Sequence, residues 1–127
     1  MLVVIDTNVL VSAFWSKNGN PAKILDMVLA GRLKPCFDYR ILFEYREVLL
    51  RPRFDFSRTE VDAVLQIIEA VGFSVVPEPL DIFFIDESDR KFYEVSKFCN
   101  VNLITGNIKH FPKESNVITP VDFLRTL

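Results

Sequence analysis

The stretch LVVIDTN, residues 2–8, decides how the chain begins to fold. Four apolar residues are followed abruptly by three polar ones, beginning with Asp6. A short, uninterrupted apolar run is typical of a strand that is buried on both faces, as strands of parallel sheets are. The pattern therefore predicts a first strand over residues 2–5 and a polar turn at its carboxyl end.

Short apolar runs and helical patterns alternate along the rest of the chain. Further strands are expected over residues 33–37, 73–76, 101–105 and 116–118. Helices are expected from Pro21 to Gly31, from Asp38 to just before Pro52, from the capping box SRTE at 57–60 to Gly72, from residues 86–89 through Cys99, and from Thr119-Pro120 onward. Strands that alternate with helices indicate a mostly parallel sheet covered on both faces.

The composition limits what the protein can be. With 127 residues, half of them hydrophobic, the chain fits one domain spanning 1–127. A net charge of −2 argues against binding nucleic acid mainly through surface lysine and arginine. The first residues lack the features of a signal peptide, and no apolar run is long enough to span a membrane, so we expect a soluble, cytoplasmic protein. Cys36 and Cys99 stand alone and are expected to be buried thiols.

Acidic and polar residues follow two of the expected strands. Ligands of open parallel sheets bind outside the carboxyl ends of the strands, where Asp6 and the run Thr105-Gly106-Asn107 are expected. Asp89, in the first turn of a helix, and Glu44, flanked by apolar residues, could face the same crevice. Carboxylates gathered in a partly dry site repel one another unless a cation neutralises them.

The donor types select the cation. Carboxylate and amide oxygens suit Mg²⁺ or Mn²⁺, whereas zinc prefers histidine or cysteine, and His110 is the only histidine. A divalent cation makes water a usable nucleophile near neutral pH and stabilises charge on a phosphate. Metal-assisted phosphodiester hydrolysis follows, and the cation also explains how an acidic protein could hold a polyanion.

Four segments in order carry a family resemblance: VVIDTNVLVS at 3–12, ILFEYREVL at 41–49, DESDRKF at 86–92 and ITGN at 104–107. Together they resemble the PIN (PilT N-terminus) domain, and in particular the single-domain proteins described as toxins of VapC-type toxin-antitoxin pairs. The resemblance implies a three-layer α/β/α sandwich with a central mostly parallel sheet. It also implies a homodimer that cleaves RNA with Mg²⁺ or Mn²⁺, and an antitoxin protein as a partner.

Carried over by position, the resemblance makes Asp6, Glu44 and Asp89 the catalytic, metal-binding acids. Asn8 would support the first of them, and Thr105 would orient the site by hydrogen bonding.

Two positions depart from the family pattern. The fourth acidic position, often aspartate, is Asn107 here. Its amide oxygen can bind the metal but adds no charge, and Asp86 is a candidate metal ligand that could supply the missing charge. The helix of Glu44, which often begins with serine in the family, begins with Asp38. Either residue can cap a helix.

Structural roles compete with some of these assignments. Asp6 could serve only as a helix cap, and Glu44 could pair on the surface with Arg40. Of Asp86 and Asp89, one is expected to be merely structural, because both suit a helix N-terminus.

Residues that could touch the substrate are few. Lys109 and Lys113 follow Asn107 and are candidates to contact RNA phosphates, although such clusters are mostly solvated surface. His110 is expected to be a turn residue. The many aromatic side chains are expected to lie in the core or an interface rather than to stack on bases.

Three other functions compete with the ribonuclease. A haloacid-dehalogenase-type phosphatase needs a second aspartate two residues after the first, where Asn8 stands, and a receiver domain needs an aspartate after the third strand, where none occurs. A catalytically weak or inactive PIN-like module that binds RNA or protein remains the alternative to the ribonuclease, because of Asn107.

Overall fold

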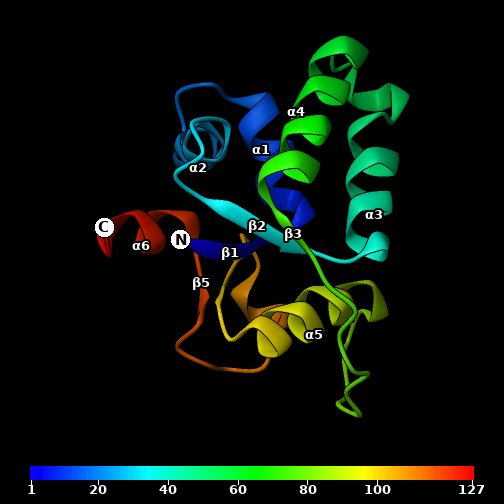
Figure 1. Ribbon diagram of the computed structural model, residues 1–127, viewed down its shortest axis with the longest axis vertical. Helices are drawn as coiled ribbons and strands as arrows, with labels where there is room; N and C mark the ends of the chain where they lie inside the picture. The colour runs from blue at the N-terminus through cyan, green and yellow to red at the C-terminus, as the bar shows by residue number, and fades with distance from the viewer.

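The computed structural model describes residues 1–127 and contains one sheet of five parallel strands (Figure 1). Their order is β3-β2-β1-β4-β5, and every adjacent pair is parallel. The strands are β1 (Leu2–Ile5), β2 (Lys34–Phe37), β3 (Phe73–Ser74), β4 (Asn102–Ile104) and β5 (Val117–Ile118). The sequence-based expectation of a parallel sheet is confirmed.

Six helices cover the sheet. They are α1 (Thr7–Trp15), α2 (Asn20–Leu29), α3 (Tyr39–Leu49), α4 (Arg58–Val71), α5 (Arg90–Cys99) and α6 (Pro120–Arg125). In Figure 1, α1 to α4 gather on one side of the sheet and α5 lies on the opposite side, beneath β1, β2 and β4. The expected three-layer α/β/α sandwich is confirmed. None of the helices is long and apolar enough to cross a membrane.

Helix α1 corrects the expectation of a simple polar turn after the first strand. The chain enters this helix directly at Thr7. Val9, Leu10 and Ala13 repeat at helical spacing and are all buried, so apolar packing extends the turn into nine residues of helix. The strong β-propensity of the segment hid this periodicity.

The predicted helix ends are confirmed by their caps. Asp38 accepts a hydrogen bond from the Ile41 amide at 3.0 Å, and Ser57 and Thr119 cap α4 and α6 in the same way. Gly31, just after α2, has a φ of 77°, which favours glycine.

Strand β3 is shorter than expected, with two residues instead of four, and both are exposed. The chain passes tightly against β2 just before it. A Cβ atom added to Gly72 would lie 2.3 Å from the Pro35 carbonyl oxygen. Only glycine permits this approach.

The core contains 29 buried hydrophobic residues between the sheet and the helices. It includes Tyr45, whose hydroxyl donates to the Ile5 carbonyl and ties α3 to the end of β1. Cys36 is buried as expected, whereas Cys99 is only partly buried; both are free thiols.

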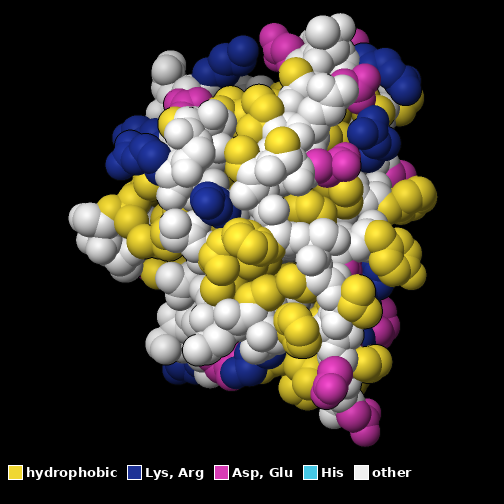
Figure 2. Space-filling model, in the orientation of Figure 1, with side chains coloured by type: hydrophobic (Ala, Val, Ile, Leu, Met, Phe, Trp, Pro, Cys, Tyr) yellow, Lys and Arg dark blue, Asp and Glu magenta, His cyan; other side chains and the backbone are white.

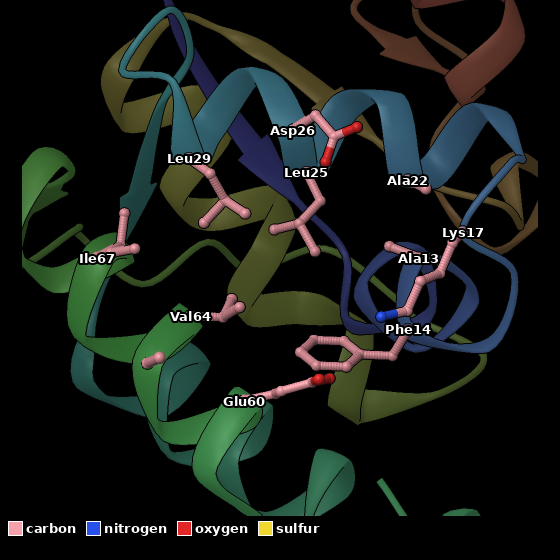
Figure 3. A pocket seen from close by; sticks show the side chains of 11 residues that line it. Ala13, Phe14, Lys17, Ala22, Leu25, Asp26, Leu29, Glu60, Val64 and Ile67 are labelled. Atoms are coloured by element: carbon pink, nitrogen blue, oxygen red, sulfur yellow. The ribbon is translucent and has the colours of Figure 1, made fainter. Parts of the chain in front are cut away.

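An apolar hollow of about 310 Å³ lies between α1, α2 and α4 (Figure 3). Phe14, Leu25 and Val64 point into it, and Asp26 and Glu60 stand at its margin. It lies beside the core and is lined by none of the predicted site residues.

Candidate functional site

The centre of the sheet positions the candidate site. Strand β1 lies between β2 and β4, so the strand order changes direction there, and ligands of open parallel sheets bind outside the carboxyl ends of strands at such a point. Asp6 follows β1 directly, and its amide donates to the carbonyl of Ile104 at 2.9 Å. Thr105 follows β4. Residues 99 positions apart in the sequence thus meet at one edge.

Asp6 is held by side chains from both strand ends. Thr105 Oγ1 donates to Asp6 Oδ2 at 2.8 Å, and Asn8 Nδ2 donates to the same oxygen at 3.2 Å. Asn8 Oδ1 in turn accepts from the Gly106 amide at 3.1 Å. The predicted supporting positions of Asn8 and Thr105 are therefore in contact with Asp6, which is only 5% exposed.

Glu44 reaches the same region from α3. Its Oε2 accepts a hydrogen bond from the Thr7 hydroxyl, the residue next to Asp6, and its Oε1 lies 2.7 Å from Lys91 Nζ. The proposed surface pair with Arg40 does not form, because Arg40 binds Asp38 instead. Lys91 as the partner of Glu44 was missed from the sequence.

Asp89 contributes a buried carboxylate from the start of α5. Its side chain is 12% exposed, and Oδ2 forms no hydrogen bond, although His110 Nδ1 lies 3.4 Å away. Burial raises the pKa of Asp89, and the charge of Asp86 raises it further.

The acids act on one another. Burial raises the pKa of Asp6 from 3.8 to about 6, and the charges of Asp89 and Glu44 add to this, against the hydrogen bond from Thr105, which lowers the pKa. Three carboxylates from different segments thus share one negative field. A raised carboxyl pKa with identified charged neighbours is a frequent property of functional sites.

The other predicted positions lie around this centre. Asp86 is exposed, and its Oδ1 accepts hydrogen bonds from the amide and hydroxyl of Ser88, so it caps a short turn. Asn107 is exposed, and its backbone amide donates to Thr105 Oγ1. Lys109 and Lys113 line a separate hollow and form no ion pair. Their ligand and substrate roles remain predictions.

The site residues match a hard cation in chemistry, although not in their present arrangement. Asp6 and Asp89 offer carboxylate oxygens in a region of concentrated negative charge, and Asp89 Oδ2 is buried without a hydrogen bond. However, no three acidic, histidine or cysteine side chains lie close enough together to hold one metal ion. Glu44 instead holds Lys91, so a shared ion would have to displace this ammonium group.

The buried acid Glu94 was not identified from the sequence. It is 3% exposed, accepts from the Leu80 amide at 2.8 Å and lies 2.9 Å from Arg40. Arg40 also binds Asp38, the cap of the helix that carries Glu44. In the sequence Glu94 stands between Tyr93 and Val95, which are both buried, and this was the available signal.

Fold and site together define a class: a three-layer α/β/α protein whose acids gather at the carboxyl ends of the central parallel strands. The PIN domain family model matches residues 2–109. The chain is also 34% identical over 108 residues to the uncharacterized protein MJ1680 of Methanocaldococcus jannaschii, an alignment that covers 83% of this chain and 70% of that protein. The chain belongs to the PIN domain family, whose members are generally nucleases and typically use divalent metals.

Proposed function

We propose that this protein is an endoribonuclease dependent on Mg²⁺ or Mn²⁺, with Asp6, Glu44 and Asp89 as its catalytic acids. The observation that carries the proposal is the shared negative field, in which the charges of Asp89 and Glu44 help to raise the pKa of Asp6 to about 6. A buried concentration of charge destabilises a fold, so its presence favours a functional role.

Each residue has a role in this proposal. Thr105 and Asn8 fix the Asp6 carboxylate, and Thr7 orients Glu44 from the same turn. A divalent ion bound by Asp6 and Asp89, which Glu44 would join after releasing Lys91, would neutralise phosphate charge and acidify a water molecule. Thr7, Asn8 and Thr105 are positioning residues, because they act through the acids.

An RNA cleavage assay with metal titration tests the proposal. The purified protein is expected to cut single-stranded RNA with added Mg²⁺ or Mn²⁺ and to stop when the ions are chelated. Asp6→Asn should lose this cleavage, whereas Asp26→Asn, a change of an exposed aspartate without an ion pair, should retain it. Equal RNA breakdown by the wild type and Asp6→Asn would mean contamination and would remove the basis for the assignment.

We further propose that the ribonuclease is the toxin of a toxin-antitoxin pair, works as a homodimer in the cytoplasm, and is inhibited by an antitoxin that covers the acidic crevice. The family membership supports this finer assignment. Expression in a bacterial host should arrest growth with intact Asp6 and permit growth with Asp6→Asn. Normal growth with an active nuclease would contradict the toxin role and leave the nuclease standing.

Two observations favour a catalytically weak or inactive RNA- or protein-binding module as the second candidate. Asn107 brings no charge to the position where the family resemblance implies an aspartate, and Lys91 already neutralises Glu44. Isothermal titration of the protein with Mn²⁺ separates the candidates. Binding that Asp6→Asn abolishes supports the nuclease, and absence of both binding and cleavage supports the inactive module.

A further inference from the structure

Two aromatic rings stand in solvent beside the candidate site. Tyr39 is 81% exposed and Phe43 is 72% exposed, so neither ring lies in the core. They are four residues apart on α3 and therefore share one face of the helix. Neither ring packs on another aromatic side chain. In Figure 2 hydrophobic side chains stand out on the surface over the beginning of α3, at the right of the view.

The rings border a hollow that reaches Glu44. Its volume is about 520 Å³, and Glu44, one of the three candidate catalytic residues, lines it together with Tyr39 and Phe43. An occupant of this hollow would therefore touch the aromatic rings and lie next to the reacting centre.

The charge of the hollow suits a phosphate chain. Three cationic side chains line it, Arg40, Arg90 and Lys91, against two acidic ones, so its net charge is +1 in a chain whose total is −2. All three cations are already paired, Arg40 with Asp38 and Glu94, Arg90 with Glu87 and Lys91 with Glu44, so a phosphate would share or replace these carboxylates. Exposed aromatic rings beside cations are the combination that binds single-stranded nucleic acid.

We propose that Tyr39 and Phe43 form a stacking platform for an unpaired base of the RNA substrate, adjacent to the phosphate that is cut. The inference rests on the proposed ribonuclease function. It makes the enzyme selective for single strands, because the bases of a duplex are already stacked and their faces are covered.

Fluorescence of a short single-stranded RNA that contains 2-aminopurine tests the platform, since stacking on an aromatic ring quenches this base. Binding is measured in the Asp6→Asn background so that no cleavage intervenes. Replacing both rings in Tyr39→Leu/Phe43→Leu should weaken binding by roughly tenfold and abolish the quenching. Tyr39→Phe/Phe43→Tyr keeps both rings and should bind as the parent does.

Phe98→Leu is the matched control, because Phe98 is also an exposed aromatic residue on a helix but does not line the hollow. It should leave affinity and quenching unchanged. Binding of duplex RNA should be equal in all variants. Equal single-strand affinity with and without the rings, or no measurable binding by the parent, would overturn the platform.

Sedimentation of the same variants separates RNA from a protein partner. If the double leucine variant loses self-association while its RNA affinity is unchanged, the face is a contact between copies of the chain and the platform is wrong. The outcomes also separate this inference from the proposed function. Metal-dependent cleavage with unaltered binding in the leucine variant would overturn only the platform, whereas quenched binding without any cleavage by the wild type would overturn only the nuclease.

Discussion

Asp6→Asn should stabilise the fold at neutral pH while it abolishes the proposed activity. Asp6 is 5% exposed, and its pKa is raised from 3.8 to about 6, chiefly by burial. Asparagine has nearly the same shape and keeps an oxygen that can accept the hydrogen bond from Thr105. The substitution therefore removes a buried charge with little change in packing.

The pKa difference sets the magnitude and its pH window. The interval from 3.8 to about 6 corresponds to about 3 kcal/mol, at roughly 1.36 kcal/mol per pH unit. Below pH 3.8 Asp6 is protonated in both states and contributes nothing. Between 3.8 and about 6 the folded state binds more protons than the unfolded state, so stability falls as the pH rises, and above about 6 the full cost remains. Since burial of the new amide offsets part of the gain, we expect Asp6→Asn to gain about 1 to 3 kcal/mol at neutral pH.

Urea denaturation with a chelator present measures this gain. The wild type and Asp6→Asn should differ at about pH 7.5 and converge near pH 4. Asp26→Asn, which changes an exposed carboxylate, should show no such pH-dependent gap. A variant less stable than the wild type at neutral pH, or a gap independent of pH, would refute the argument that the buried charge is costly.

Adding Mg²⁺ should offset the stability advantage of Asp6→Asn. A ligand that binds only the folded state stabilises it by about 2.7 kcal/mol at a hundred times its Kd. The wild type should gain stability with Mg²⁺, whereas Asp6→Asn should not. Equal responses of the two proteins would show that the ion binds elsewhere.

Three further substitutions, one of them with a matched control, test the fold and the surroundings of the site. Glu94→Gln removes the charge that pairs with Arg40 at 2.9 Å. Because Arg40 is partly exposed, the free energy of unfolding should fall by only about 1 to 2 kcal/mol in urea denaturation, and wild-type stability would contradict this. Gly72→Ala should cost about 1 to 3 kcal/mol, because its Cβ would meet a backbone oxygen at 2.3 Å, whereas Gly19→Ala, with no atom nearer than 3.6 Å, should be close to neutral. Lys91→Met removes the ammonium that occupies Glu44 and should raise Mn²⁺ affinity several-fold by calorimetry; unchanged affinity would show that the two do not compete.

Local signals in the sequence were sufficient for most of the fold. The caps Asp38, Ser57 and Thr119 lie where the expected helices begin, because each satisfies a backbone amide at a defined position. Strand β1 was recognisable because burial on both faces leaves an uninterrupted apolar run. Strand existence was predictable, whereas strand length was not, since length depends on pairing with a neighbour, as β3 shows.

The unpredicted features depend on contacts between distant segments. Lys91 meets Glu44 and Glu94 meets Arg40 only because α5 and α3 pack together at one edge of the sheet. Neither pair has a regular sequence spacing that would reveal it. The exposure of Tyr39 could not be predicted either, because the sequence does not distinguish a solvent-facing tyrosine from a core tyrosine such as Tyr45.

The hydrogen bonds of Asp6 help to decide between a structural and a functional aspartate. Asp6 occupies the cap position of α1, where a structural aspartate accepts from the first amides of the helix, as Asp38 does for α3. Its side chain does not cap α1 in this way: it accepts from the side chains of Thr105 and Asn8, besides the adjacent Thr7 amide, which lowers its pKa. The helix therefore begins without side-chain capping, and the carboxylate faces the other acids at a cost in stability. An aspartate selected only for the fold would cap the helix and would not lower stability. The stability of Asp6→Asn is therefore the most direct test of the site.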